Sequence, residues 1–146
     1  MVTQVKKLST IEKMICLKSV DIFEHATVEQ LARIAGLSQE VDLASGETIY
    51  AEGQPSDALY FLLSGRILLE KSGTPAFEVN EGETFGTLAA LDRQPHLYSA
   101  KAAGVAHILK LDTRDFHDLL SLDSGLALAV LRVLCRLIRS GRFAMS

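Results

Sequence analysis

The spacing of apolar residues changes twice along the chain and divides it into a helical start, a strand-rich middle and a helical end. Residues 9–36 carry apolar residues at helical spacing, and their two segments begin with capping boxes at Ser9 and Thr27. We expect two helices here, with Gly36 placed to end the second. Residues 112–140 return to helical spacing, with Asp123 as the cap of a last helix.

Residues 38–111 instead show short apolar runs of strand length, with a turn about every 8–12 residues. The run from Ala58 to Leu63 is apolar throughout, so we expect a central strand that is covered on both faces. About eight strands at this spacing indicate a jelly roll or a small barrel. We therefore predict an α+β fold, mainly β. A single domain over residues 1–146 would hold an antiparallel jelly roll of about eight strands (a double-stranded β-helix), flanked by N-terminal and C-terminal helices.

Composition narrows the class of protein. The chain has 146 residues, of which 48% are hydrophobic and 23% charged, and its net charge is −3. These values are typical of a packed globular domain and do not favour a basic surface for nucleic acid. The start of the chain lacks the apolar core of a secretory signal. The longest apolar stretch, residues 126–138, contains two arginines and is shorter than the ~20 residues of a membrane helix. We expect a cytoplasmic protein with no membrane span and no nucleic-acid partner.

The two cysteines, Cys16 and Cys135, lie in apolar helix-like segments. In a reducing compartment such residues are mostly buried free thiols rather than disulfides. We expect both thiols to be buried and free.

The segment from Phe85 to Ser99 carries the strongest chemical signal. Gly86 leads into a short apolar helix, and Pro95 closes the loop behind it. Backbone N–H groups at such a helix start have no partner within the helix and can face an anion. A charged ligand would ordinarily also meet an arginine, and a ribose would meet a carboxylate. The segment offers His96 and Thr87 instead, so we expect the scaffold of an anion site without its two strongest groups.

Turn and strand motifs along the chain point to one family. They are Phe23 ahead of the helix at 28–34, Ser45-Gly46-Glu47, Glu52-Gly53-Gln54-Pro55-Ser56-Asp57, Leu59-Tyr60-Phe61-Leu62 with Ser64-Gly65-Arg66, Glu81-Gly82-Glu83-Thr84-Phe85-Gly86, and residues 89–91 with Pro95. In order and spacing this set resembles the cyclic nucleotide-binding domain, the module of bacterial catabolite-activator-type regulators and of kinase regulatory subunits. The resemblance covers about residues 14–137 and implies the jelly-roll fold.

The resemblance also implies a phosphate-binding cassette at residues 86–99. The family pattern there is Phe-Gly-Glu-x-Ala, followed by Pro-Arg-Ser/Ala-Ala-Ser/Thr. Its glutamate accepts the ribose 2′-hydroxyl, and its arginine contacts the cyclic phosphate. In this chain the glutamate position is Thr87 and the arginine position is His96. The next two positions hold the bulky Leu97 and Tyr98, and Ser99 agrees with the pattern.

Loss of the arginine and glutamate contacts removes about 3–6 kcal/mol, which is two to four decades of affinity. We therefore expect cyclic AMP and cyclic GMP to bind very weakly or not at all, and we expect no cofactor. The candidate ligand-binding positions are Phe85, Gly86, Thr87, Leu88, Ala89, His96, Leu97, Tyr98 and Ser99.

The departures from the pattern leave alternatives open. His96 is either a partly charged contact for an anion or a plain loop histidine. Thr87 either caps the short helix or contacts a ligand. Tyr98, together with Leu97, either fills the pocket or packs in a strand. Arg93 is either a solvated loop charge or a substitute for the missing arginine.

Nothing in the sequence supports catalysis. His25, His107 and His117 are scattered and have no partners at metal-ligand spacing. Ser64 and Ser99 lack the context of an activated nucleophile. A cupin, an enzyme of related barrel shape, would need histidines and a glutamate together on its strands. We expect no metal site and no enzyme.

We therefore expect a regulatory module that acts through its terminal helices on a partner or an adjoining domain. The alternative is a working sensor that binds a cyclic nucleotide, another nucleotide or a small anion through backbone amides, His96 and Ser99. The last helix is apolar on more than one face, which suits a homodimer or an adjoining domain. Its stripe of Arg132, Arg136 and Arg139 is either solvated or a contact for an acidic partner. We expect no helix-turn-helix in these residues.

Overall fold

Residues 7–141 are described by the computed structural model, and residues 1–6 and 142–146 lie outside that description. The helices are α1 (Thr10–Lys18), the 3-10 helix η1 (Asp21–Phe23), α2 (Val28–Leu37), α3 (Thr87–Asp92), α4 (Thr113–Leu122) and α5 (Ser124–Arg139). The strands are β1 (Gln39–Leu43), β2 (Thr48–Tyr50), β3 (Ala58–Ser64), β4 (Ile67–Lys71), β5 (Thr74–Val79), β6 (Thr84–Phe85), β7 (Ser99–Ala102) and β8 (Ala106–Asp112).

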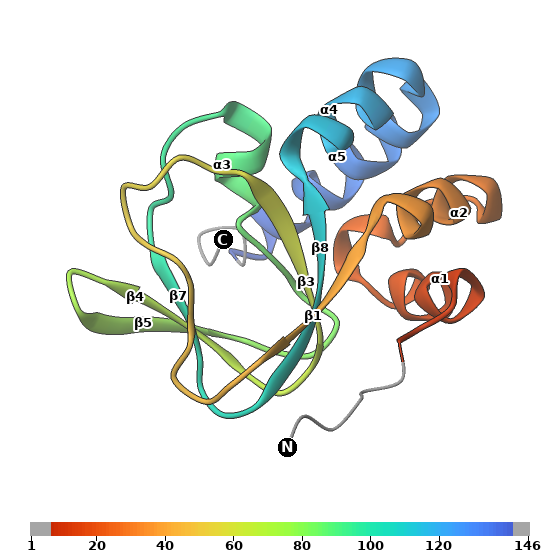
Figure 1. The fold of residues 1–146 in the computed structure, drawn as a ribbon. Coiled ribbons are helices and arrows are strands. Elements are labelled where there is room, and N and C mark those ends of the chain that lie inside the picture. Colours follow the sequence, from red (N-terminus) through yellow and green to blue (C-terminus); the bar gives the residue numbers. More distant parts are fainter. Residues whose placement is uncertain (1–6, 142–146) are drawn as a thin grey trace.

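Within the described residues the strands form two four-stranded antiparallel sheets, with the orders β1-β8-β3-β6 and β2-β7-β4-β5. The helices α1, α2, α4 and α5 gather on one side of the first sheet, and the β4–β5 hairpin lies on the far side of the roll (Figure 1). The short helix α3 lies on the connection from β6 to β7 and contacts α4 through Ala90 and His117. The predicted eight-stranded antiparallel jelly roll with terminal helices is confirmed.

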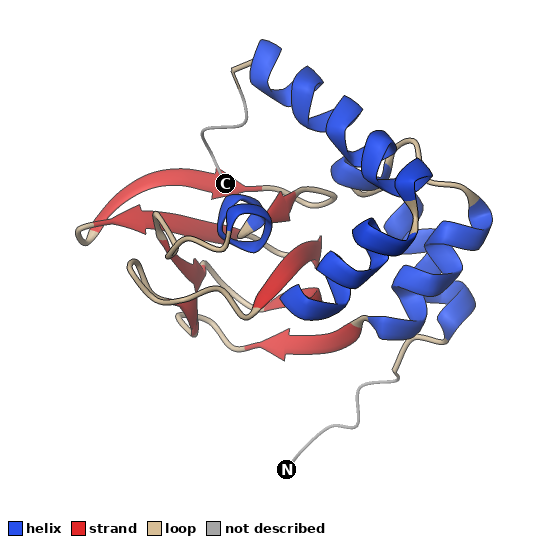
Figure 2. Ribbon diagram, turned by 90° about the horizontal axis from the view of Figure 1, so that it is seen from above, coloured by secondary structure: helices blue, strands red, loops and turns tan. Residues whose placement is uncertain are grey.

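The apolar run at 58–63 becomes β3, which lies between β8 and β6 in the first sheet. Leu59 and Phe61 face the helices, where the ring of Phe61 lies 5.2 Å from that of Phe23. Tyr60 and Leu62 face the space between the two sheets. Because successive strand residues point to opposite faces, a strand covered on both faces needs apolar residues throughout. Figure 2 shows the sheets and the helical layer side by side.

The ends of the first helices follow the predicted caps with one exception. The side chains of Ser9 and Thr27 accept backbone N–H groups in complete capping boxes. The prediction that Gly36 ends α2 is wrong, because the helix continues to Leu37. Ser38 caps it in an extended conformation (φ −82°, ψ 140°), and its hydroxyl donates to the Ile34 carbonyl at 2.7 Å. Since the chain passes directly into β1, it needs no left-handed turn at Gly36.

The two thiols are free, but they differ in exposure. Cys16 is half-buried on α1, and burial raises the pKa of its thiol. Cys135 is exposed, so the expectation that both thiols are buried is wrong. Val133 and Leu134 take the inner face of α5, which leaves position 135 on the outer face. No helix between residues 7 and 141 combines the length and the apolar character that crossing a membrane requires.

In the turn between β3 and β4, we predict that one added methyl group strongly lowers the free energy of unfolding. A Cβ on Gly65 (φ +95°) would lie 2.6 Å from the carbonyl oxygen of Val105, whereas a Cβ on Gly73 (φ +78°) would meet nothing within 4 Å. Gly65→Ala should lower the free energy of unfolding by about 1–3 kcal/mol more than Gly73→Ala, because both variants strain φ but only the first forces β8 away. Urea unfolding measures both, and equal losses would contradict the prediction.

Candidate functional site

Four rings meet between the two sheets, beside the start of α3. Tyr50 comes from β2, Tyr60 from β3, Phe85 from β6, and His96 from the loop between α3 and β7. The His96 ring stacks on Tyr50 with a centroid distance of 3.6 Å and an interplanar angle of 10°. Tyr60 stacks on Phe85 at 5.2 Å and lies 5.6 Å from Tyr50. We call these four residues the ring cluster.

His96 is the polar member of the ring cluster, and it is only 4% exposed. Its backbone N–H donates to the Gln54 carbonyl at 3.0 Å, and its carbonyl accepts the Gly53 N–H at 2.8 Å. These two bonds tie the loop of residues 93–98 to the loop before β3. The ring atom Nε2 is buried and has no hydrogen-bond partner among the described residues.

Burial lowers the pKa of His96 below the ordinary value of 6.5, and the nearby Asp57 carboxylate opposes that shift in part. The imidazole is therefore neutral at pH 7. Asp57 also accepts the Tyr60 hydroxyl at 3.2 Å. Burial, and then the Asp57 charge, raise the pKa of Tyr60, so this phenol keeps its proton. The ring cluster thus carries no charge of its own and has one carboxylate at its edge.

The start of α3 does not have the threonine cap that was one of the two hypotheses for Thr87. Gly86 is the N-cap, in the left-handed conformation (φ +74°), and no side chain caps the helix. Thr87 is the first helical residue and is 3% exposed, so the hypothesis that its hydroxyl caps the helix is wrong. A Cβ on Gly86 would lie 3.3 Å from Tyr60, a tight contact, and 3.5 Å from both His96 and Tyr50. Glycine is favoured here chiefly because of the left-handed φ.

The structure separates the other candidate positions. Phe85 and Ala89 are buried, whereas Leu88 is half-buried. Leu97 is 47% exposed, so the suggestion that it fills the pocket is wrong; the alternation of the chain turns His96 inward instead. Tyr98 packs edge-on against Phe77 at 5.6 Å, with the Lys71 ammonium 5.6 Å from its ring centroid. The Ser99 hydroxyl accepts the Glu52 N–H at 2.9 Å.

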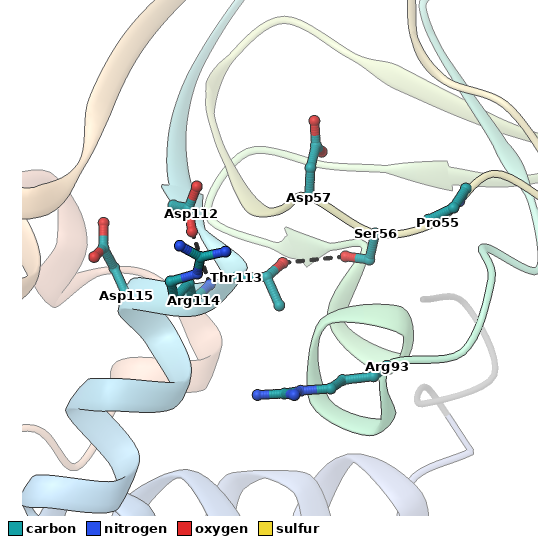
Figure 3. A pocket seen from close by; sticks show the side chains of 8 residues that line it. All are labelled: Pro55, Ser56, Asp57, Arg93, Asp112, Thr113, Arg114 and Asp115. Carbon is teal, nitrogen blue, oxygen red and sulfur yellow. Dashed lines mark hydrogen bonds between the residues drawn. The ribbon is translucent and has the colours of Figure 1, made fainter.

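A cavity of about 670 Å³ opens between the loop at 55–57, the end of α3 and the start of α4. Arg93 reaches into it below Thr113, whose hydroxyl lies 3.3 Å from that of Ser56 (Figure 3). The Thr113 N–H donates to the Asp57 carbonyl at 3.0 Å, so this amide at the start of α4 has a partner. Arg93 therefore faces a cleft of mixed charge. The lining residues are Pro55, Ser56, Asp57, Arg93, Asp112, Thr113, Arg114 and Asp115.

The remaining histidines lie apart from the ring cluster. His107 on β8 contacts the carboxylates of Glu40 (2.9 Å) and Asp42 on the neighbouring strand β1. The His117 ring lies 2.6 Å from the Ala90 carbonyl, between α4 and α3. In the part of the chain that the structure describes, no group of three histidine, cysteine, aspartate or glutamate side chains is placed to hold a metal ion.

Sequence reasoning identified His96, Gly86 and Phe85, but it did not anticipate Tyr50, Tyr60 or Asp57 as their neighbours. Tyr50 ends a three-residue strand, and Tyr60 lies within an apolar run that reads as core. Asp57 reads as a turn residue. The available signal was that both tyrosines alternate with residues of opposite facing, which assigns them to the interior between the sheets.

Two four-stranded antiparallel sheets form the jelly roll, and α3, with Gly86 as its N-cap, begins beside the ring cluster. The chain belongs to the cyclic nucleotide-binding domain family, whose model matches residues 40–123. The match includes the whole candidate cassette.

Known relatives agree with this assignment. The chain is 34% identical over 106 residues to a cAMP-dependent protein kinase regulatory subunit of Aspergillus niger, which covers 71% of this chain and 26% of that protein. It is 26% identical over 128 residues to a CRP-like cAMP-activated global transcriptional regulator of Mycobacterium tuberculosis, covering 84% of this chain and 57% of that protein. The N-terminal domain of a transcriptional regulator from Streptomyces coelicolor superposes with a TM-score of 0.73 at 29% identity, over 90% of this chain and 95% of that one.

The lowered pKa of His96 predicts that the protein loses stability as the pH falls. The pKa of His96 is lowered in the folded protein, so the unfolded chain binds more protons as the pH falls below 6.5. The stability is full above pH 6.5 and is lost as the pH falls from there to the folded-state pKa. Between pH of about 7.5 and 5, the free energy of unfolding should therefore fall more steeply in the wild type than in His96→Gln, by at most about 1.4 kcal/mol per pH unit.

Urea unfolding across this pH range measures both slopes. The exposed His25 supplies the matched control, and His25→Gln should keep the wild-type slope. A wild-type slope no steeper than that of His96→Gln would contradict the prediction.

Proposed function

We propose that this chain is a regulatory module whose cassette binds cyclic AMP and cyclic GMP weakly or not at all. It acts through its terminal helices on a partner, an adjoining domain or a second copy. Cyclic nucleotides are the ligand class to test, because the names of the Aspergillus niger and Mycobacterium tuberculosis relatives both include cAMP. The proposed role is regulation rather than catalysis, since those relatives are a regulatory subunit and a transcriptional regulator.

The stacking of His96 on Tyr50 is the observation that carries the proposal. By the family resemblance, His96 stands where an arginine would hold the cyclic phosphate. A neutral imidazole that is 4% exposed and stacked at 3.6 Å offers no cation to a phosphate. The strongest contacts to a phosphate come from a charged, outward-facing donor, which a buried neutral ring cannot supply. The arginine position is therefore occupied by a ring that packs in the interior of the roll.

The other cassette positions support the same conclusion. Thr87, at the glutamate position, has no carboxylate for a ribose hydroxyl and is 3% exposed. The hydroxyl of Ser99, the position that agrees with the family, accepts the Glu52 N–H at 2.9 Å. The alternative is a sensor that binds a nucleotide or small anion through backbone amides, His96 and Ser99. A contact from the His96 ring to such a ligand requires the ring to leave Tyr50.

The helices that would carry an output are tied to one another by polar contacts. The Asp123 carboxylate caps α5 by accepting a hydrogen bond from the Leu126 N–H at 3.0 Å. It also accepts one from the guanidinium of Arg33 on α2 at 2.7 Å. The Leu126 N–H first, and then Gln30 and Arg33, lower the pKa of Asp123. Arg136 of the arginine stripe pairs with Glu24 beside η1 at 2.9 Å. A change in the roll that moved η1 or α2 would therefore reach α5.

The outer face of α5 carries an exposed apolar stripe beside its arginines. Its residues recur at positions i, i+3, i+7 and i+10, the spacing of a helix that packs against a second helix. Opposite them, Leu126, Val130 and Val133 pack into the core. We assign this outer stripe to a second copy of the chain. Its residues are Leu128, Leu131, Cys135 and Ile138.

The cassette proposal predicts a gain of binding. Thr87→Glu with His96→Arg restores both family contacts and removes the stacked ring. The double variant should bind cyclic AMP more tightly than the wild type by about two to four decades, which corresponds to about 3–6 kcal/mol. Isothermal titration calorimetry near pH 7.5 measures both proteins, and the wild type should give no saturable heat at micromolar concentration.

Thr87→Glu with His96→Gln is the matched control, because it also removes the imidazole but supplies no guanidinium. Its affinity should stay well below that of the arginine variant. Saturable micromolar binding by the wild type would overturn the proposal and favour the working sensor. Equal binding by the two double variants would show that no phosphate contact forms at position 96.

The assignment of α5 predicts self-association. Leu131→Lys should weaken a dimer by about 3–6 kcal/mol, because two copies of the side chain lose an apolar contact. Val105→Lys is the control, since Val105 is 79% exposed but lies away from α5, at the start of β8. Sedimentation velocity over a concentration series measures all three proteins. A wild type that stays monomeric, or equal effects of the two variants, would contradict a homodimer through α5.

A further inference from the structure

We propose that His96 is a proton-operated latch: its neutral imidazole holds the loop of residues 93–98 against Tyr50, and its protonation releases that loop. This inference rests on the proposed regulatory function only for its consequence, which is that the site responds to a proton rather than to a nucleotide. The latch itself is a property of the loop and can be tested without any ligand or partner.

The closed state depends on few contacts. The described hydrogen bonds of the loop to the rest of the roll include the two backbone bonds between His96 and residues 53 and 54. The stack on Tyr50 adds one ring contact at 3.6 Å. Arg93, at the start of the loop, and Leu97 and residues 94–95 within it are exposed, so they add little burial that would hold the segment down. Tyr98, at the end of the loop, packs separately on Phe77. A change at the His96 side chain therefore acts on the attachment of the loop ahead of Tyr98.

The closed state also leaves one hydrogen-bonding atom unpaired. Nε2 of His96 is buried and has no partner among the described residues. In the neutral tautomer with its proton on Nδ1, this atom is an acceptor without a donor. Protonation would turn it into a buried charged donor without an acceptor, which is still less favourable. The neutral ring is thus tolerated inside the roll, whereas the cation is expelled toward water.

The groups that face His96 do not rescue the cation in the closed position. Tyr50 of β2 presents the face of its ring, and Tyr60 of β3 directs its hydroxyl to Asp57. Phe85 and Gly86 carry no charge. Asp57, in the loop before β3, is the charged group that attracts a proton to His96, but burial outweighs it and lowers the pKa of His96. Nearby, Glu52 accepts the Ser72 N–H at 2.8 Å, and Arg93 points into the separate cleft of Figure 3.

Nuclear magnetic resonance on the whole chain tests the latch between pH of about 7.5 and 5. The His96 imidazole should titrate with a midpoint below 6.5, and the ring signals of Tyr50 should move with that same midpoint. Amide exchange at residues 53 and 96, corrected for its intrinsic pH dependence, should be constant above pH 6.5 and should rise as the pH falls from there to the folded-state pKa of His96. The rise should be at most about tenfold per pH unit, because opening is coupled to one proton.

Two variants make the result decisive. His96→Asn removes the titrating group and should abolish the pH dependence at residue 53, whereas His25→Gln should leave it unchanged. Tyr50 signals or corrected exchange rates that do not follow the His96 titration would overturn the latch, as would a His96 midpoint at or above 6.5. These outcomes are independent of calorimetry with cyclic AMP, so failure of the latch and failure of the cassette proposal can be told apart.

Discussion

The stack of His96 on Tyr50 is the contact on which the candidate site depends. It joins the loop after α3 to the second sheet, fills the space beside Gly86 and determines which cassette side chains face water. An imidazole can take this place because its neutral form is apolar enough to be buried against a phenol ring. An arginine cannot lose its charge in a protein and would be held at the surface. The position that the family resemblance assigns to a phosphate-binding arginine thus holds a ring that is buried in the interior.

The rest of the fold surrounds this contact with rigid elements. β3 is covered on both faces, by the helices through Leu59 and Phe61 and by the second sheet through Tyr60 and Leu62. It thus connects the ring cluster to the helical layer within one strand. Asp123 and Arg136 then bind α5 to α2 and to the residue after η1. The helices lie against the same sheet that carries Tyr60 and Phe85 of the ring cluster, which is the physical basis for a regulatory role.

The family assignment is compatible with a buried His96 at the cassette, because a fold does not determine a ligand. The glycine and turn positions preserve the roll, since several of them hold backbone conformations that other residues adopt with strain. The ligand contacts depend instead on individual side chains, which change without altering the backbone. By the family resemblance, Thr87, His96 and Leu97 differ from the cassette pattern at such positions, within an intact jelly roll.

The sequence by itself determined the strands, the capping boxes, the short helix after Gly86 and the loss of the cassette arginine, because each depends on local spacing or on residue type. It predicted a helix end at Gly36 and a buried Cys135, and both were wrong because the direction of the following strand and the rotation of α5 are set by packing. It also named Leu97 as a filler of the pocket, whereas the loop turns His96 inward. Only the tertiary structure decided that His96 meets Tyr50, since these rings are brought together by the pairing of distant strands and not by any pattern near either residue.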